Sequence, residues 1–223
     1  MFIRLCAAVA CATLASANAS VAQAITQRII GPNANGEPLE TRGVSPNSIS
    51  QLAAAAGVPM GLETAPREQG RSAAPAHETV RLTGQTLYAG LDALMALDPR
   101  YEWRDLDGVI VIRPIAAWYD IQNPLNAPVS GVKLEDVRCG RAALELAAKS
   151  LGRTDSRNYL SDSKRCTIEM PQGTVFDVLN AAVRAHGELT WAVEWTPFDH
   201  QDLAAMVWMF VAGAGGYGEG ITK

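Results

Sequence analysis

Residues 80–112 read VRLTGQTLYAGLDALMALDPRYEWRDLDGVIVI and combine a short strand, a capped helix and a closing hairpin. Val80 and Leu82 alternate as in a strand, and Thr86 precedes an apolar stripe with helical spacing, where an N-cap is expected. Asp107 and Gly108 form a dipeptide typical of a tight turn between paired strands. The stretch therefore predicts the order strand, helix, strand, strand.

The same apolar pattern recurs 88 positions later, in residues 168–195. The matched pairs are Val80 and Ile168, Leu82 and Met170, Thr86 and Thr174, Leu87 and Val175, Leu91 and Leu179, Met95 and Val183, Tyr101 and Leu189, and Trp103 and Trp191. Such a recurrence predicts a duplicated structural unit. Because each copy has its own apolar stripe, it indicates two small binding modules rather than one enzyme built around one cleft.

Each copy is preceded by a further strand and a further helix. In the first unit Ser48, with Gln51 three residues on, is expected to cap a helix that Gly57 ends. The sequence thus predicts an α+β fold of two tandem β-α-β-β-α-β-β modules, each a small sheet packed on two helices. The expected boundaries are a signal peptide at 1–24, a flexible lead-in at 25–38, modules at 39–114 and 131–212, a linker at 115–130 and a flexible tail at 213–223.

The first 24 residues have the features of a secretory signal peptide. Arg4 precedes an uncharged apolar run, and Ala22 and Ala24 form a small-residue cleavage pattern, so cleavage is expected after Ala24. The run is shorter than the roughly 20 apolar residues of a membrane span. A lipoprotein anchor on Cys11 is an alternative, but Ala8 stands where a larger aliphatic residue is needed. We therefore expect an exported chain with no transmembrane segment.

The charge of the mature chain bears on its partners. The whole chain carries a formal net charge of −4, and loss of Arg4 with the signal peptide leaves −5. Nucleic-acid binding needs a basic face that replaces phosphate counterions. The acidic balance therefore disfavours a nucleic-acid partner.

Two of the four cysteines, Cys139 and Cys166, remain after cleavage of the signal peptide. In an exported protein such a pair is most simply a disulfide, although two buried thiols are the alternative. Neither cysteine has a counterpart in the first unit. We therefore expect a local link within the second module.

The two units resemble the short N-terminal domain of secretins and TonB-dependent receptors. The likeness is carried by LAAAAGVPMGLE at 52–63 with residues 80–112, and more loosely by LELAAKSLG at 144–152 with TIEMPQGTVFDVLNAAVRAHGELTWAVEW at 167–195. The resemblance implies small α/β modules that make protein contacts in the periplasm of a Gram-negative envelope. The second unit is followed by neither a barrel nor a secretin core. We therefore expect neither receptor signalling nor channel function to follow from the resemblance.

Few residues point to catalysis. Asp199, His200 and Asp202 share one short stretch, which is more typical of a solvated loop than of the converging ligands of a metal site. Glycines 213, 215 and 218 have dinucleotide-binding spacing, but too few residues follow to form the helix that this motif needs. His77 and His186 have adequate structural explanations in a loop and at a helix end. No cofactor is expected.

The linker aromatics Trp118 and Tyr119 are the best candidates for an interface, because no regular element requires them to be buried. Trp103, Trp191 and Trp195 are more typical of core positions. The resulting hypothesis is a periplasmic protein-interaction module, an envelope adaptor or assembly component without catalysis, that binds an envelope protein. The alternatives are a small secreted hydrolase or metal-dependent enzyme that uses the Asp199 to Asp202 stretch, and a structural envelope subunit that self-associates.

Overall fold

Capping and turn residues set the ends of the elements in the first half of the chain. The structure, a computed structural model, describes residues 25–66, 79–151, 157–158, 164–198 and 202–212. Thr86 caps the second helix as predicted, and its hydroxyl accepts the Ala89 N–H at 3.2 Å. The first-half elements are β1 (Glu40–Thr41), α2 (Pro46–Ala56), β2 (Met60–Glu63), β3 (Val80–Arg81), α3 (Leu87–Leu97), β4 (Tyr101–Leu106) and β5 (Val109–Pro114).

The start of α2 differs from the sequence expectation. Ser45, and not Ser48, is the N-cap, and Pro46 stands in the first turn, where its missing N–H has no cost. Ser48 is the third helical residue, and its hydroxyl accepts the Ser45 N–H at 2.9 Å to complete a capping box. The expectation was wrong because it overlooked the helix-starting proline. Gly57 ends α2 in the left-handed conformation, with φ of 62°, as predicted.

The second half begins inside the expected linker. The stretch 115–130 holds two 3₁₀ turns and the first residues of β6. Thr174 caps α5 as predicted, in a capping box with Asp177. The second-half elements are η1 (Ile115–Trp118), η2 (Pro124–Asn126), β6 (Pro128–Arg138), α4 (Cys139–Leu151), β7 (Arg157–Asn158), β8 (Arg165–Thr174), α5 (Val175–His186), β9 (Leu189–Phe198) and β10 (Asp202–Val211).

Both halves contribute to one six-stranded sheet, with the order β4-β5-β2-β9-β10-β7. The halves meet where β2 pairs with β9 in parallel, from Met60 opposite Thr190 to Glu63 opposite Val193. The α+β class is confirmed. The separate small sheets expected for the modules are instead joined into one, because β2 accepts a strand of the other half along its second edge.

The strand pairings follow the same order in the two halves. β4 pairs with β5 and β9 with β10 in antiparallel hairpins. The outer partner is parallel in both cases, β2 beside β5 and β7 beside β10. Two-stranded antiparallel pairs, β1 with β3 and β6 with β8, complete the set. The order of pairings thus agrees with the repeated pattern of the sequence, while the duplication itself stays a prediction.

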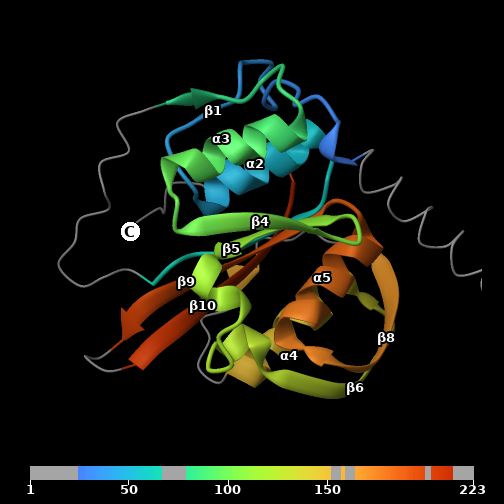
Figure 1. The fold of residues 1–223 in the computed structure, drawn as a ribbon. Coiled ribbons are helices and arrows are strands. Elements are labelled where there is room, and N and C mark those ends of the chain that lie inside the picture. The colour runs from blue at the N-terminus through green and yellow to red at the C-terminus, as the bar shows by residue number, and fades with distance from the viewer. Residues whose placement is uncertain (1–24, 67–78, 152–156, 159–163, 199–201, 213–223) are drawn as a thin grey trace, which may run out of the picture.

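The helices of the two halves lie on opposite faces of the sheet (Figure 1). The α2/α3 side buries Ala192 and Trp208 from second-half strands, and the α4/α5 side buries Val109 and Val111 from a first-half strand. Each half therefore covers part of the other. The β6–β8 ribbon curves around α4 and α5 on the far side from α2 and α3 (Figure 1).

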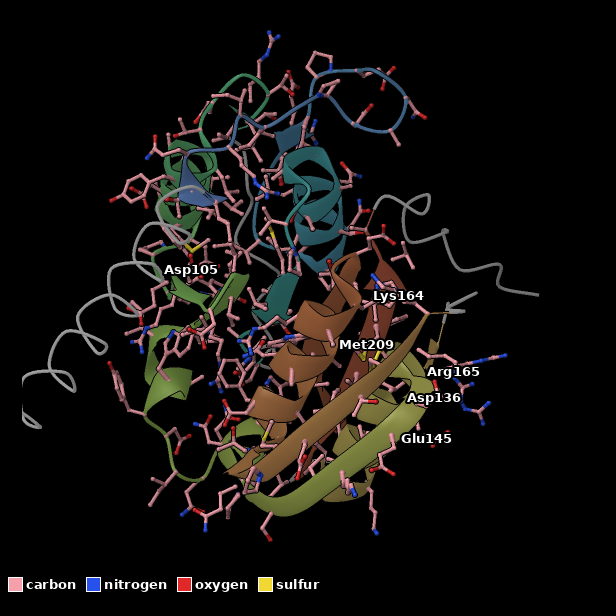
Figure 2. All side chains as sticks on the ribbon, turned by 90° about the vertical axis from the view of Figure 1, so that its right-hand side faces the viewer. Asp105, Asp136, Glu145, Lys164, Arg165 and Met209 are labelled. Carbon is pink, nitrogen blue, oxygen red and sulfur yellow. A yellow bond between two sulfur atoms is a disulfide. The ribbon has the colours of Figure 1, made fainter. Side chains whose placement is uncertain are left out.

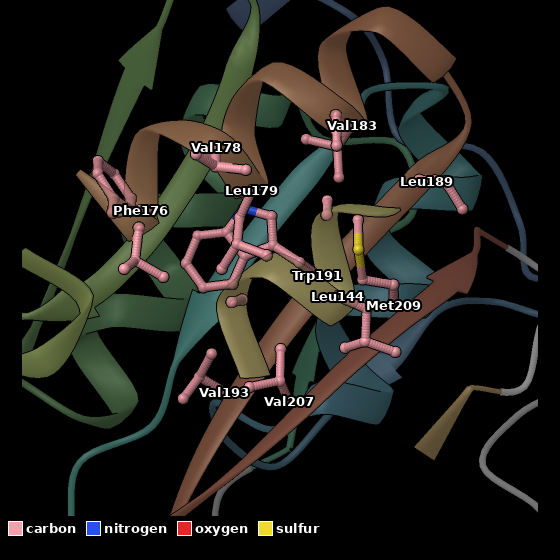
Figure 3. Packing of buried hydrophobic residues seen from close by; sticks show 14 of the residues in the cluster. Leu144, Phe176, Val178, Leu179, Val183, Leu189, Trp191, Val193, Val207 and Met209 are labelled. Carbon is pink, nitrogen blue, oxygen red and sulfur yellow. The ribbon is translucent and has the colours of Figure 1, made fainter. Parts of the chain in front are cut away.

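A glycine permits the close approach of the two halves. Trp191 is fully buried at the centre of the α4/α5 core, with Leu179 and Val183 above it (Figure 3). Gly61 of β2 lies opposite Trp191 in the β2–β9 pair. A Cβ on Gly61 would stand 2.2 Å from the Trp191 indole, and the indole itself is held because its Nε1 donates to the Asn180 Oδ1 at 2.9 Å. No larger residue fits at position 61 without displacing the indole.

We expect Gly61→Ala to lower the free energy of unfolding by about 2–4 kcal/mol, because the added methyl overlaps a buried ring that has no space to move. Urea denaturation followed by tryptophan fluorescence measures the loss. The matched control is Gly43→Ala, since a Cβ there meets no atom within 4 Å. Equal stability of the two variants would contradict the packing described.

A disulfide links the start of α4 to β8. Cys139, the first residue of α4, is bonded to Cys166 of β8, with their Cα atoms 5.4 Å apart and a sequence separation of 27. The predicted bridge is thus present, and it suggests an oxidising compartment. No helix in the described parts of the chain is long and apolar enough to cross a membrane.

Replacing Cys139 and Cys166 together by serine is expected to cost about 3–4 kcal/mol of stability, because the unfolded chain regains the entropy of an open loop. Urea midpoints of the wild type and the variant, each with and without dithiothreitol, measure this. The reductant is expected to lower the wild type to the level of the variant and to leave the variant unchanged. A wild type insensitive to complete reduction would contradict a stabilising bridge.

Candidate functional site

A buried ion pair lies at the end of the first-half strands. Glu63, the last residue of β2, accepts a hydrogen bond from Arg113 Nε of β5 at 2.6 Å, and each side chain is 1% exposed. The second Glu63 oxygen accepts from Asn123 Nδ2 at 2.6 Å and from Trp195 Nε1 at 3.0 Å. Arg113 Nη1 donates to Asn126 Oδ1 at 3.0 Å. One carboxylate thus joins the first half, the linker and the second half.

The same asparagines hold the linker in a fixed shape. Asn126 Nδ2 donates to the carbonyls of Ala117 and Asp120, at 2.9 and 2.8 Å. Asn123 Oδ1 accepts the Leu125 N–H at 2.8 Å, and the Leu125 side chain is fully buried. The segment 115–126 is therefore anchored to the ion pair through Asn123 and Asn126, and to the core through Leu125.

Trp118 is part of this anchored structure. It is half-buried against the α4/α5 core and meets Phe176 edge to face, with ring centroids 5.9 Å apart. The guanidinium carbons of Arg104 and Arg113 lie 4.1 and 5.2 Å from its ring centroid. A cation that lies above the face of an aromatic ring is attracted by the electron density of that ring. Trp118 therefore packs against the protein, although no regular strand or α-helix contains it.

Tyr119, by contrast, is 76% exposed. Its hydroxyl accepts a hydrogen bond from Arg104 Nη2 of β4 at 2.9 Å. Burial lowers the pKa of Arg104, but its hydrogen bonds to Tyr119 and Glu102 outweigh that effect and raise the pKa overall. The guanidinium therefore stays charged and holds the phenol ring in place.

Two isoleucines close to Tyr119 in sequence are exposed as well. Ile115 is 47% exposed and Ile121 is 86% exposed. Among the described residues, the other large apolar side chains with such exposure are Ile29 and Tyr88. We call Ile115, Tyr119 and Ile121 the linker patch. Most of these exposed side chains thus lie within seven positions of sequence. Solvated isoleucines on a fixed backbone are typical of a contact surface.

The structure separates the two aromatic residues that the sequence singled out. Trp118 points into the protein and Tyr119 out of it, so the candidate surface rests on Tyr119. Sequence reasoning missed Ile115 and Ile121, although two isoleucines in a linker rich in proline and asparagine were a usable signal. It also missed Glu63 and Arg113, which are 50 positions apart and share no motif.

The other candidate residues contribute little to a described site. Asp199, His200, His77 and the glycines at 213, 215 and 218 lie outside the described residues, and the side chain of Asp202 is not described. His186 is 3% exposed at the end of α5, where its Nδ1 accepts the Glu188 N–H at 3.3 Å. The described part of the chain holds no group of three or more His, Cys, Asp or Glu residues that could bind a metal ion.

Two surface hollows hold polar groups that already serve the fold. The first, of about 320 Å³, lies between the β4–β5 turn and α5. It includes Asp177, which completes the capping box of α5, and Arg184, which donates to the Leu106 and Asp107 carbonyls. The second, of about 590 Å³, surrounds the start of α2 and includes its cap, Ser45. Neither brings together a nucleophile and a base.

No protein-family model, curated protein or solved structure matches the chain.

Glu63→Gln is expected to lower the free energy of unfolding by about 3–5 kcal/mol, because it leaves the buried Arg113 charge without its counter-charge. Guanidinium denaturation measures the loss. Adding Arg113→Met to this variant removes the unpaired charge and is expected to recover part of the lost stability. Glu135→Gln is the matched control, since Glu135 forms an ion pair with Lys133 in which both side chains are more than 60% exposed. A loss from Glu63→Gln no larger than the control's would contradict the central place given to the pair.

Proposed function

We propose that this chain is an exported, periplasmic protein-interaction module without catalysis, which binds an envelope protein through the linker patch. The observation that carries the proposal is the exposure of Tyr119 and Ile121, at 76% and 86%, on a segment held by partly buried hydrogen bonds. An adaptor or assembly component needs such a preformed contact surface. The periplasmic location rests on the predicted signal peptide, the disulfide and the resemblance to the secretin and TonB short N-terminal domain.

The composition of the patch suits a protein partner. A phenol ring offers a large apolar face and a polar end, and such residues are enriched among those that dominate binding energy. Ile115 and Ile121, close to Tyr119 in sequence, supply further exposed apolar area. Arg104, bonded to Tyr119, adds a cation at the rim. A partner surface with an apolar centre and an acidic margin fits this arrangement.

Rigid presentation favours binding. Ordering a flexible loop on association costs roughly 0.5–1.5 kcal/mol for each immobilised side chain that is rich in rotamers. The asparagine contacts to Ala117 and Asp120 hold the backbone before binding, and the Arg104 bond restricts Tyr119. Most of the entropy cost of ordering the segment is therefore met when the chain folds. The free energy of the new contacts then contributes to affinity.

Photocrosslinking in the native envelope tests the proposal. A benzoylphenylalanine at position 121 is expected to capture a defined envelope protein, and the same probe at position 141, on the exposed face of α4, is not. The double variant Tyr119→Ala/Ile121→Ala is expected to weaken binding of the captured protein at least tenfold with its stability unchanged, because both side chains are mostly exposed. Unaltered affinity in this variant would overturn the proposed surface.

Two further variants separate competing explanations. Trp118→Ala is expected to lower the unfolding midpoint, because its half-buried ring packs against Phe176, so it reports on folding and not on the surface. His200→Ala is expected to leave binding unchanged. An enzyme that used the Asp199 to Asp202 stretch would instead lose activity in that variant, which a screen of hydrolase substrates would detect.

A further inference from the structure

The strand β4 ends the six-stranded sheet with one edge unpaired. β5 lies along one side of it, and no strand of the described residues lies along the other. An unpaired edge is a template for another strand, and natural proteins usually protect it. The edge residues and their charges indicate which strand fits here.

The outward backbone groups of β4 are those of its odd-numbered residues. Ile115 N–H donates to the Arg100 carbonyl, so Arg100 and Ile115 form a hydrogen-bonded pair. Such pairs recur at every second residue of the register, so Glu102 and Arg104 are also hydrogen-bonded to β5. In an antiparallel ladder the intervening residues direct their N–H and C=O groups away from that partner. On the β5 side this alternation is seen directly, because Ile110 N–H donates away from β4, to the Pro59 carbonyl. Trp103 and Asp105 therefore offer backbone groups to the open edge.

This alternation restricts how a second β4 strand can pair with the first. Hydrogen-bonded residues face each other in an antiparallel pair, so odd-numbered residues must face odd-numbered residues. Three registers satisfy this rule and keep most of the strand paired, with the centre at Glu102, at Trp103 or at Arg104. The first places Glu102 opposite itself, and the third places Arg104 opposite itself. Only the middle register places Glu102 opposite the partner's Arg104, twice over by symmetry.

We propose that β4 pairs with β4 of a second copy of this chain in the register centred on Trp103, which extends the sheet across a two-fold axis. Cross-strand pairs of opposite charge stabilise a sheet and like charges directly opposite destabilise it, so the edge selects its own copy in one register. Glu102 and Arg104 are available for this, with 35% and 34% of their side chains exposed. They already form an ion pair within the strand, and the dimer joins the two pairs in a four-charge cluster.

The backbone and the aromatic residues support the same register. The facing Trp103 backbones exchange two hydrogen bonds, and each Asp105 N–H reaches the partner's Tyr101 carbonyl. The Tyr101 N–H is already used, because it donates to the Asp98 carbonyl. On the opposite face from the charges, Trp103 packs edge to face against Tyr88, which is 50% exposed. The dimer brings two such aromatic pairs together at its axis.

Sedimentation equilibrium of residues 25–223 tests the proposal. The wild type is expected to form a dimer that dissociates on dilution. Glu102→Arg alone and Arg104→Glu alone each place like charges opposite one another at both sites, and each is expected to weaken the dimer at least tenfold. An equimolar mixture of these two variants is expected to form a heterodimer, because every facing pair is then of opposite charge. The double variant Glu102→Arg/Arg104→Glu is expected to dimerise as the wild type does.

A matched control lies across the molecule. Glu145→Arg disrupts an ion pair of similar form, with Arg141 on α4, and is expected to leave the dimer unchanged. Figure 2 shows Glu145 far from Asp105 of β4. Circular dichroism melts establish that each variant folds. A wild type that is monomeric at millimolar concentration overturns the proposal, as does a dimer that survives both single changes or a mixture that gives no heterodimer.

This inference stands apart from the proposed function, because it concerns the purified chain alone. The linker patch adjoins β4 through the Arg104–Tyr119 bond, so the two surfaces must be tested by different readouts. Loss of the captured envelope protein in Tyr119→Ala/Ile121→Ala bears on the patch. Charge-dependent self-association bears on the β4 edge, and either result stands if the other fails.

Discussion

The parallel pairing of β2 with β9 is the contact on which the rest of the structure depends. It joins the strands of both halves into one sheet, and it is possible because Gly61 leaves space for the Trp191 indole. The helices of each half then lie on opposite faces, and each face is covered partly by strands of the other half. Neither half buries its full apolar surface alone, so we expect the two halves to fold together around the two cores.

A buried charge, the Glu63 carboxylate, lies at the end of the β2–β9 pair. The Glu63 carboxylate is fully surrounded by donors from Arg113, Asn123 and Trp195, as a desolvated charge requires. A buried ion pair adds little stability compared with apolar packing, but each member is costly to remove alone. The pair also orders the linker, because Asn123 and Asn126, which bond Glu63 and Arg113, also hydrogen-bond the linker backbone. The backbone next to residues 119 and 121 is held in this way, because Asn126 donates to the Asp120 carbonyl.

The pairing of β2 with β9 also determines which strand edges stay unpaired. In an isolated first module both β2 and β4 would be edges, but β9 covers β2, and β4 remains. The linker patch lies beside that remaining edge, since Arg104 of β4 bonds Tyr119. An apolar patch and an unpaired strand thus adjoin at one end of the sheet. This proximity gives a physical basis for the interaction role proposed for the chain.

The sequence by itself determined the local structure. Thr86 and Thr174 as caps, Gly57 as a helix end, Asp107–Gly108 as a hairpin turn and the Cys139–Cys166 pair were all readable from residue type and spacing, because each depends on neighbours along the chain or on the count of cysteines. Tertiary structure alone decided that β2 pairs with β9, that Glu63 meets Arg113, and that Trp118 turns inward while Tyr119 turns outward. These contacts join residues far apart in sequence, and the spacing of residues along one chain carries no record of which apolar faces will meet.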